Sequence, residues 1–101
     1  MSYLININRN PNLRYLINDY RTYCDQEGLS ALDPAFTNFV RFFAHHDILI
    51  GTNSDRRGYR AFVTDLIAGE ERDQLYFDNE EMARQDAVHK GFEILHSRNN
   101  R

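Results

Sequence analysis

The stretch from Asp78 to Leu95 constrains the fold more than any other, because small residues recur in it at every fourth position. Ala83, Ala87 and Gly91 fall on one side of a helix, since residues four apart share a helical face. A helix with such a side can lie close against a sheet. We expect it to span 79–97 and to bury a face made of Ala83, Ala87, Val88, Gly91, Phe92, Ile94 and Leu95.

The start of this helix carries capping residues. Asp78 can accept a hydrogen bond from the first turn while Glu81 reaches back, which is the capping-box pattern. Phe77 and Met82 occupy the two positions of a hydrophobic staple. These residues predict that the helix begins directly after Asp78.

Three runs of β-type composition precede the helix, at about 47–53, 59–68 and 74–77. The turn-forming sequences NSDRRG and GEERD separate them, and short turns favour antiparallel pairing. The second run alternates. One face is predicted to carry Tyr59, Ala61 and Val63, and the other Phe62, Thr64 and Leu66.

The N-terminal third is predicted to be mainly helical. Proline at the first helical position loses no needed donor, so Asn10-Pro11 and Asp33-Pro34 indicate two helix starts. We expect amphipathic helices at 11–27 and 34–45, with Gly28 ending the first. Before them, the β-type run 3–8 predicts a short edge strand within 1–9, and 97–101 is expected to form a frayed tail.

The chain is therefore predicted to be a single α+β domain, residues 1–101, in which a three-stranded antiparallel sheet is packed by a C-terminal helix. A net charge of −3 disfavours non-specific binding to nucleic acid or anionic membranes. The single Cys24 cannot form an intramolecular disulfide, which favours a reducing compartment. No apolar run approaches the roughly 20 residues of a membrane span. We expect a cytoplasmic protein without a membrane partner.

From about residue 33 onward, the predicted α-β-β-β-α order resembles the double-stranded RNA-binding domain. The resemblance implies two RNA contacts. The family's basic run of the form K-K-x-A-K falls on Glu80, Glu81, Met82, Ala83 and Arg84. Its Gly-Pro-x-His turn falls on Arg57-Gly58-Tyr59-Arg60. Two anions stand where the family has cations, and they would repel phosphate. We therefore expect no RNA binding by the family's usual face.

No arrangement of residues indicates catalysis. The adjacent His45 and His46 point in different directions on an ordered element, and His89 and His96 lie far along the chain. Cys24 falls on an apolar helix face, where free cysteine behaves as a small hydrophobe. The chain has no nucleophile, phosphate-loop or dinucleotide motif. We expect no enzymatic activity, no catalytic or metal-binding residues and no cofactor; a small metal-dependent or hydrolytic enzyme is a residual alternative.

Charge is unevenly distributed. The segment from Asp65 to Asp86, the acidic strip, holds eight acidic residues against Arg72 and Arg84. It is interpreted either as a solvated face or as a docking surface for a basic partner. Arg56 and Arg57 are also placed to neutralise Asp78, Glu80 and Glu81. The candidate partner-binding residues are Glu70, Glu71, Asp73, Asp78, Glu80, Glu81 and the helix tyrosines Tyr15 and Tyr23.

The sequence best supports a small non-enzymatic protein that binds another protein. Its short length and lack of chemistry are similar in general character to accessory or inhibitory proteins of phages and mobile elements. A three-stranded sheet leaves two edges and one face to be covered, so a homodimer is a further possibility. The alternative function is nucleic-acid binding, with phosphates contacted by Arg56, Arg57 and Arg60.

Overall fold

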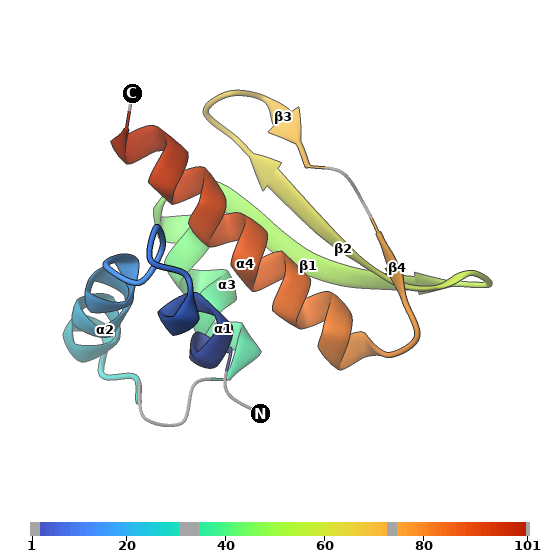
Figure 1. Ribbon diagram of the computed structural model, residues 1–101, viewed down its shortest axis with the longest axis horizontal. Coiled ribbons are helices and arrows are strands. Elements are labelled where there is room, and N and C mark those ends of the chain that lie inside the picture. Colours follow the sequence, from blue (N-terminus) through green and yellow to red (C-terminus); the bar gives the residue numbers. More distant parts are fainter. Residues whose placement is uncertain (1–2, 31–34, 73–74, 101) are drawn as a thin grey trace.

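A long antiparallel hairpin organises the fold (Figure 1). The computed structural model describes residues 3–30, 35–72 and 75–100. The elements run in the order α1 (Leu4–Arg9), α2 (Leu16–Glu27), α3 (Phe36–His45), β1 (Ile48–Asp55), β2 (Gly58–Asp65), β3 (Glu70–Glu71), β4 (Tyr76–Phe77) and α4 (Glu80–Asn99). The predicted α+β class, with an antiparallel sheet packed by a C-terminal helix, is confirmed.

The sheet is built on β2. Strand β1 pairs with its whole length, from Ile48 opposite Asp65 to Asp55 opposite Gly58. The two short strands β3 and β4 share the other edge of β2 at opposite ends. The predicted third strand is therefore two pieces of two residues each, and residue 74 lies outside the described residues.

Strand β2 ends at Asp65, earlier than the predicted 68. The Asp65 carboxylate accepts hydrogen bonds from the backbone N–H groups of Ile67 and Ala68, at 3.0 and 3.1 Å. These bonds turn the chain and compete with continued pairing. The exposed turn that results leads directly into β3.

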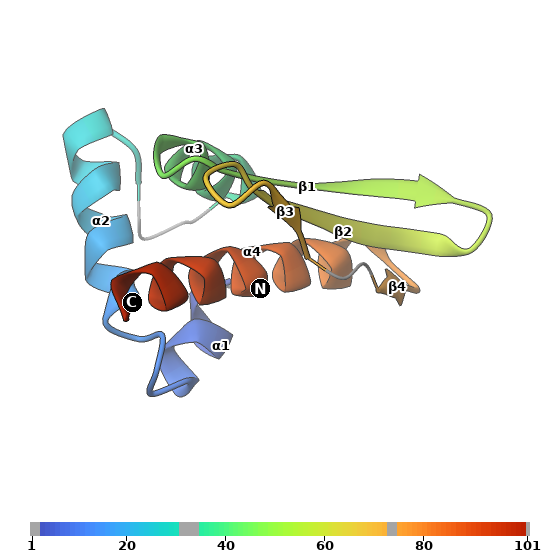
Figure 2. The same ribbon diagram turned by 90° about the horizontal axis from the view of Figure 1, so that it is seen from above.

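Helix α4 lies against one face of the hairpin, as Figure 2 shows from above. The predicted buried face is confirmed. Its small residues let α4 pack closely, since a Cβ built on Gly91 would lie 2.7 Å from the Phe43 ring. Helices α2 and α3 add an aromatic cluster on the same side. Within it, Tyr20 stacks on Phe39 with ring centroids 4.3 Å apart.

Helix α4 continues to Asn99, where a frayed tail from residue 97 was expected. Four further details of the helices differ from the prediction. The expected edge strand at 3–8 is helix α1, because Leu4 and Ile7, three residues apart, share one buried face. Helix α2 begins at Leu16, not residue 11, since Asn10 instead holds a turn by accepting from the backbone N–H of Asn12. Helix α3 begins at Phe36, and the predicted start at 33–34 lies outside the described residues.

The fourth difference is the cap of α4. Asn79, not Asp78, accepts the hydrogen bond from the backbone N–H of Met82, at 2.9 Å. Asn79 has the extended backbone of a cap residue, and its short side chain reaches the first turn. The capping box predicted for Asp78 and Glu81 is therefore wrong. Gly28, by contrast, ends α2 in the left-handed conformation that was predicted.

Candidate functional site

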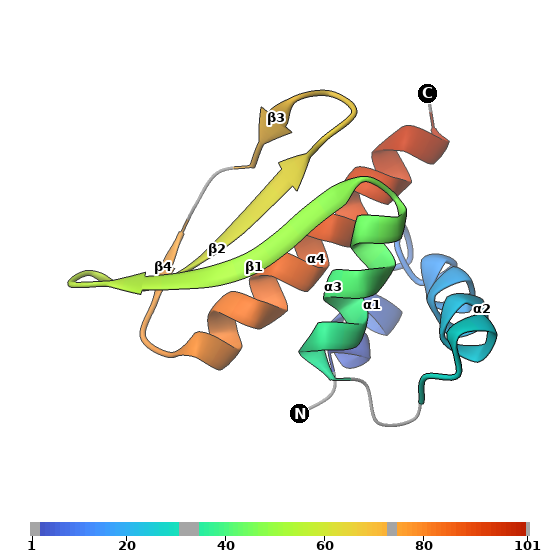
Figure 3. The same ribbon diagram turned by 180° about the vertical axis from the view of Figure 1, so that it is seen from behind.

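The face of the hairpin turned away from α4 carries a row of apolar side chains. We call it the outer face; it is formed by Leu49, Gly51, Asn53, Asp55, Arg60, Phe62, Thr64 and Leu66. Seen from behind in Figure 3, this face lies in front, and no described helix crosses it. Leu49 and Leu66 are 44% and 51% exposed. Apolar side chains grouped on an uncovered sheet face are typical of an interface.

Phe62 lies at the centre of the outer face. It pairs with Gly51 across the ladder, and its ring covers the glycine, since a Cβ built there would lie 2.3 Å from the ring. Leu66 extends the ladder by one pair, because its backbone N–H donates to Asp47 O at 2.9 Å. Leu66, Leu49 and Phe62 therefore occupy three successive levels along the hairpin, with Thr64 paired to Leu49 at the middle level.

The tip of the hairpin projects beyond α4 (Figures 1 and 2) and carries the predicted basic residues. Arg56 and Arg57 are exposed there. Arg57 lies over the Tyr76 ring, 4.5 Å from its centroid, and pairs with Asp55 at 3.4 Å. The backbone N–H of Arg57, then the Tyr76 hydroxyl, holds the pKa of Asp55 below its usual range. The tip is therefore an ordered cluster in which one arginine is matched by a carboxylate.

The acidic strip does not form one surface. Asp65 is buried against Arg98, and Asp86 lies 2.8 Å from Lys90 Nζ. The exposed Glu70 and Glu71 belong to β3, which pairs with the Asp65 end of β2.

The remaining acidic candidates gather at the other end of α4, at its first turn. Glu80 pairs with Arg84 at 2.9 Å and accepts from Thr52, and Glu81 accepts from the Tyr3 hydroxyl at 3.2 Å. Asp78 is exposed, whereas Asp73 lies outside the described residues. Arg57 does not pair with these carboxylates as predicted, since it contacts Asp55 and Tyr76, and Glu80 pairs with Arg84 instead.

The two candidate tyrosines behave differently. Tyr15 is 42% exposed, and its hydroxyl lies 3.2 Å from His96 Nδ1. Tyr23 is only 9% exposed, and its ring packs edge-on against Phe42. The expectation that Tyr23 lies on the surface is therefore wrong, because α2 buries a wider face between α3 and α4 than its sequence indicated.

The histidines lie in separate places. His46 is half-buried against Phe42, and burial, then the neighbouring His45, lowers its pKa. His89 pairs with Glu93 at 2.8 Å, while His96 contacts Tyr15. Within the described residues, no group of three or more His, Cys, Asp and Glu side chains is arranged to hold a metal ion. Cys24 is buried, as its place on the apolar face predicted.

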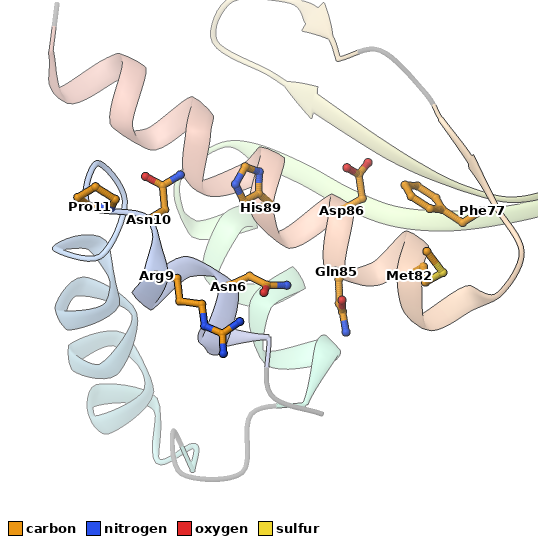
Figure 4. A pocket seen from close by; sticks show the side chains of 9 residues that line it. All are labelled: Asn6, Arg9, Asn10, Pro11, Phe77, Met82, Gln85, Asp86 and His89. Carbon is orange, nitrogen blue, oxygen red and sulfur yellow. The ribbon is translucent and has the colours of Figure 1, made fainter.

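A groove of about 720 Å³ runs between α1 and α4 (Figure 4). Phe77 and Met82 line one end and Arg9 with Asn10 the other. The groove was not predicted, because it depends on α1, whose sequence indicated a strand. Of its titratable lining residues, Asp86 and His89 have partners on α4, and Arg9 on α1 is exposed at the other end.

No helix in the described part of the chain is both long and apolar enough to cross a membrane. No protein-family model matches the chain, and no curated protein or solved structure matches it either. The outer face and the hairpin tip are therefore the two surfaces from which a function can be argued.

Proposed function

We propose that this protein is a non-enzymatic protein-binding module that docks a partner protein on its outer face. The row Leu66, Leu49 and Phe62 carries the proposal, because its side chains are apolar and at least partly exposed and no described helix crosses this face. Burying apolar side chains is the main favourable contribution to protein association. Interfaces commonly combine such a centre with a polar rim, here Arg60 and Asn53 on the side of the hairpin tip.

This surface replaces the acidic strip as the site of docking. The strip is divided between the two ends of α4, and several of its carboxylates already have partners. Glu71 remains relevant, because it pairs with Thr64 at the border of the outer face. A partner that fits has an apolar centre and charged groups at its border.

The experiment compares capture of proteins from host-cell lysate, after nuclease treatment, by wild type and by Leu49→Asp. Met82→Asp is the matched control, since Met82 is 47% exposed but lies in the groove beside α4. The proposal expects proteins retained by wild type and by Met82→Asp to be lost with Leu49→Asp. Equal retention by all three proteins would contradict it, and loss only with Met82→Asp would move the site to the groove.

Nucleic-acid binding is the second candidate, favoured by the projection of the hairpin tip with two exposed arginines. Such a tip can reach into a groove of a duplex, and its affinity would fall steeply with salt. Fluorescence anisotropy with duplex RNA and duplex DNA at several salt concentrations tests it. Binding that Arg56→Glu with Arg57→Glu abolishes would support this function; no binding at low salt would exclude it.

A further inference from the structure

The groove between α1 and α4 has the size of a small-molecule site rather than that of a surface that docks a macromolecule (Figure 4). Its volume of about 720 Å³ lies within the range of pockets that take drug-sized ligands, roughly 300–1,000 Å³. Its walls are α1 with the turn after it, and α4 with the end of β4. The side chains on these walls indicate what kind of molecule fits.

Both walls are held in place without a ligand. The Tyr3 hydroxyl donates to the Glu81 carboxylate at 3.2 Å, and the Tyr15 hydroxyl lies 3.2 Å from His96 Nδ1. These contacts tie the chain before and after α1 to two separate points of α4. Ile7, which is only 1% exposed, anchors α1 itself in the core. A groove whose walls are already fixed loses little conformational freedom when it binds a ligand.

One end of the groove is apolar. Phe77 at the end of β4 is half-buried, and Met82 in the first turns of α4 is 47% exposed. An aromatic ring packs favourably against a phenylalanine ring, and the flexible thioether of methionine adapts to such a ring. This end therefore suits a flat apolar group.

The opposite end of the groove offers hydrogen-bond donors. Arg9 is exposed there, in the last turn of α1. Asn10 Oδ1 accepts from the backbone N–H of Asn12 at 2.9 Å, which fixes the orientation of the amide. Its amide nitrogen consequently lies on the side of His89, as Figure 4 shows. A cation beside an amide donor suits the oxygen atoms of an anion.

The other charges of the groove are matched on α4. Asp86 lies 2.8 Å from Lys90 Nζ, and its carboxylate is directed away from Arg9 in Figure 4. His89 pairs with Glu93 at 2.8 Å. Arg9 forms no ion pair with a carboxylate of residues 3–30, 35–72 or 75–100. Among the described lining residues, the positive charge of Arg9 is therefore the one left for a ligand.

We propose that this groove binds a small aromatic acid, a molecule in which a flat apolar part is joined to a carboxylate, sulfonate or phosphate. The flat part packs on Phe77 and Met82, and the acid group accepts from Arg9 and Asn10. From Met82 to His89 the groove extends about 10 Å along α4, which is the length of a fused ring system that carries an acid group. The site lies on the α4 side of the hairpin, so it is independent of docking on the outer face.

Anilinonaphthalene sulfonate is a suitable probe, because it joins an aromatic body to one anionic group and fluoresces on apolar protein surfaces. A fluorescence titration of the full chain should show saturable binding of one molecule, with a dissociation constant of about 10–100 µM. Met82→Asp should weaken it about tenfold or more, since it places a carboxylate against the flat part. Ile67→Asp is the matched control and should leave it unchanged, because Ile67 is 65% exposed in the turn after β2, outside the groove.

Two results of this titration would overturn the site. One is the absence of saturable binding up to about 1 mM, beyond which an affinity of this kind has no meaning. The other is binding that Leu49→Asp weakens and Met82→Asp does not, because the probe would then lie on the outer face. Near-ultraviolet circular dichroism confirms that each variant is folded, since loosely packed proteins also bind this dye.

The uncharged analogue phenylnaphthylamine tests the acid group, because it has the same aromatic body without the sulfonate. Arg9→Gln should weaken binding of the sulfonate about tenfold and leave binding of the analogue unchanged. Arg21→Gln removes an equally exposed charge from α2 and should affect neither probe. Equal losses for both probes with Arg9→Gln would overturn the contact between Arg9 and the acid group. Equal effects of Arg9→Gln and Arg21→Gln would overturn it as well, since only net charge would then matter.

Discussion

The Arg98 guanidinium donates a hydrogen bond to the Asp65 carboxylate at 2.5 Å, and the Asp65 side chain is only 3% exposed. The same guanidinium also donates to the backbone carbonyl oxygens of His46 and Asp47. Asp65 in turn accepts from two backbone N–H groups of the turn after β2. The last turn of α4 is thereby joined to the open end of the hairpin, where β1 begins and β2 ends.

Arg98→Ala should destabilise the protein by about 3 kcal/mol or more, because it leaves a buried carboxylate without its cation. Urea denaturation, followed by circular dichroism, measures the change in the free energy of unfolding. Arg84→Ala is the matched control: Arg84 pairs with Glu80 at the other end of the same helix, but both side chains are more than a third exposed. That exposed pair should contribute about 1 kcal/mol or less. Equal effects of the two substitutions would contradict the role given to Arg98.

Lowering the pH should reduce the free energy of unfolding through protonation of Asp65. Burial alone would raise its pKa, but hydrogen bonds from Arg98 and from the Ala68 and Ile67 amides outweigh burial and lower it. A carboxyl group with a lowered pKa stabilises the fold fully above its unfolded value of roughly 3.9 and loses that contribution as the pH falls through its folded value.

The free energy of unfolding, measured between about pH 6 and about pH 2, should therefore fall more steeply for wild type than for Asp65→Asn. Asp55→Asn serves as the control, since Asp55 also has a lowered pKa but is exposed to solvent and screened. It should flatten the profile less than Asp65→Asn does. Parallel profiles for wild type and Asp65→Asn would show that another group governs acid unfolding.

The sequence predicted correctly those elements that are long enough to show a clear hydrophobic periodicity. Helix α4 has 20 residues and each strand of the β1–β2 hairpin has 8. The buried face of α4 and the alternation within β2, with Ala61 and Val63 buried and Phe62 and Thr64 on the other face, were predicted correctly. Helix α1 has 6 residues, too few to distinguish a helical from an alternating pattern. Its true conformation depends on packing with α2 and α4.

The candidate site was only partly predictable for the same reason. Arg56 and Arg57 lie in a turn whose position follows from local sequence, and they are at the tip as expected. The acidic residues are close in sequence but belong to different elements, since Asp65 ends β2, Glu70 and Glu71 form β3, and Glu80, Glu81 and Asp86 lie on α4. The pairs Glu80–Arg84 and Asp86–Lys90 follow the local i,i+4 spacing of a helix, whereas the burial of Asp65 against Arg98 is a tertiary contact that no local pattern encodes.

Asn79→Ala should destabilise the protein by about 1 kcal/mol, because it removes the side chain that caps α4. Asp78→Ala, one residue earlier, should change the free energy of unfolding by less than about half as much. Thermal denaturation of the two variants distinguishes the caps. A larger loss with Asp78→Ala would restore the capping box that the sequence favours.

Gly91→Ala tests how closely α4 approaches α3. Alanine favours an isolated helix by about 1 kcal/mol over glycine, so an uncrowded site would be stabilised. At this site the added methyl would lie 2.7–2.9 Å from three atoms of the Phe43 ring, and that ring is fully buried. Overpacking of this kind costs about 1–3 kcal/mol, so we expect a net loss of stability of about 1 kcal/mol.

The double variant Gly91→Ala with Phe43→Leu identifies the cause. If the Phe43 ring is the obstacle, Gly91→Ala should cost less, or even stabilise, once leucine replaces that ring. The coupling free energy between the two positions, obtained from urea denaturation of the four proteins, would then be favourable by about 1 kcal/mol. A coupling near zero would mean that the methyl group is accommodated without displacing the ring, and that α4 lies further from α3 than the contact with Phe43 indicates.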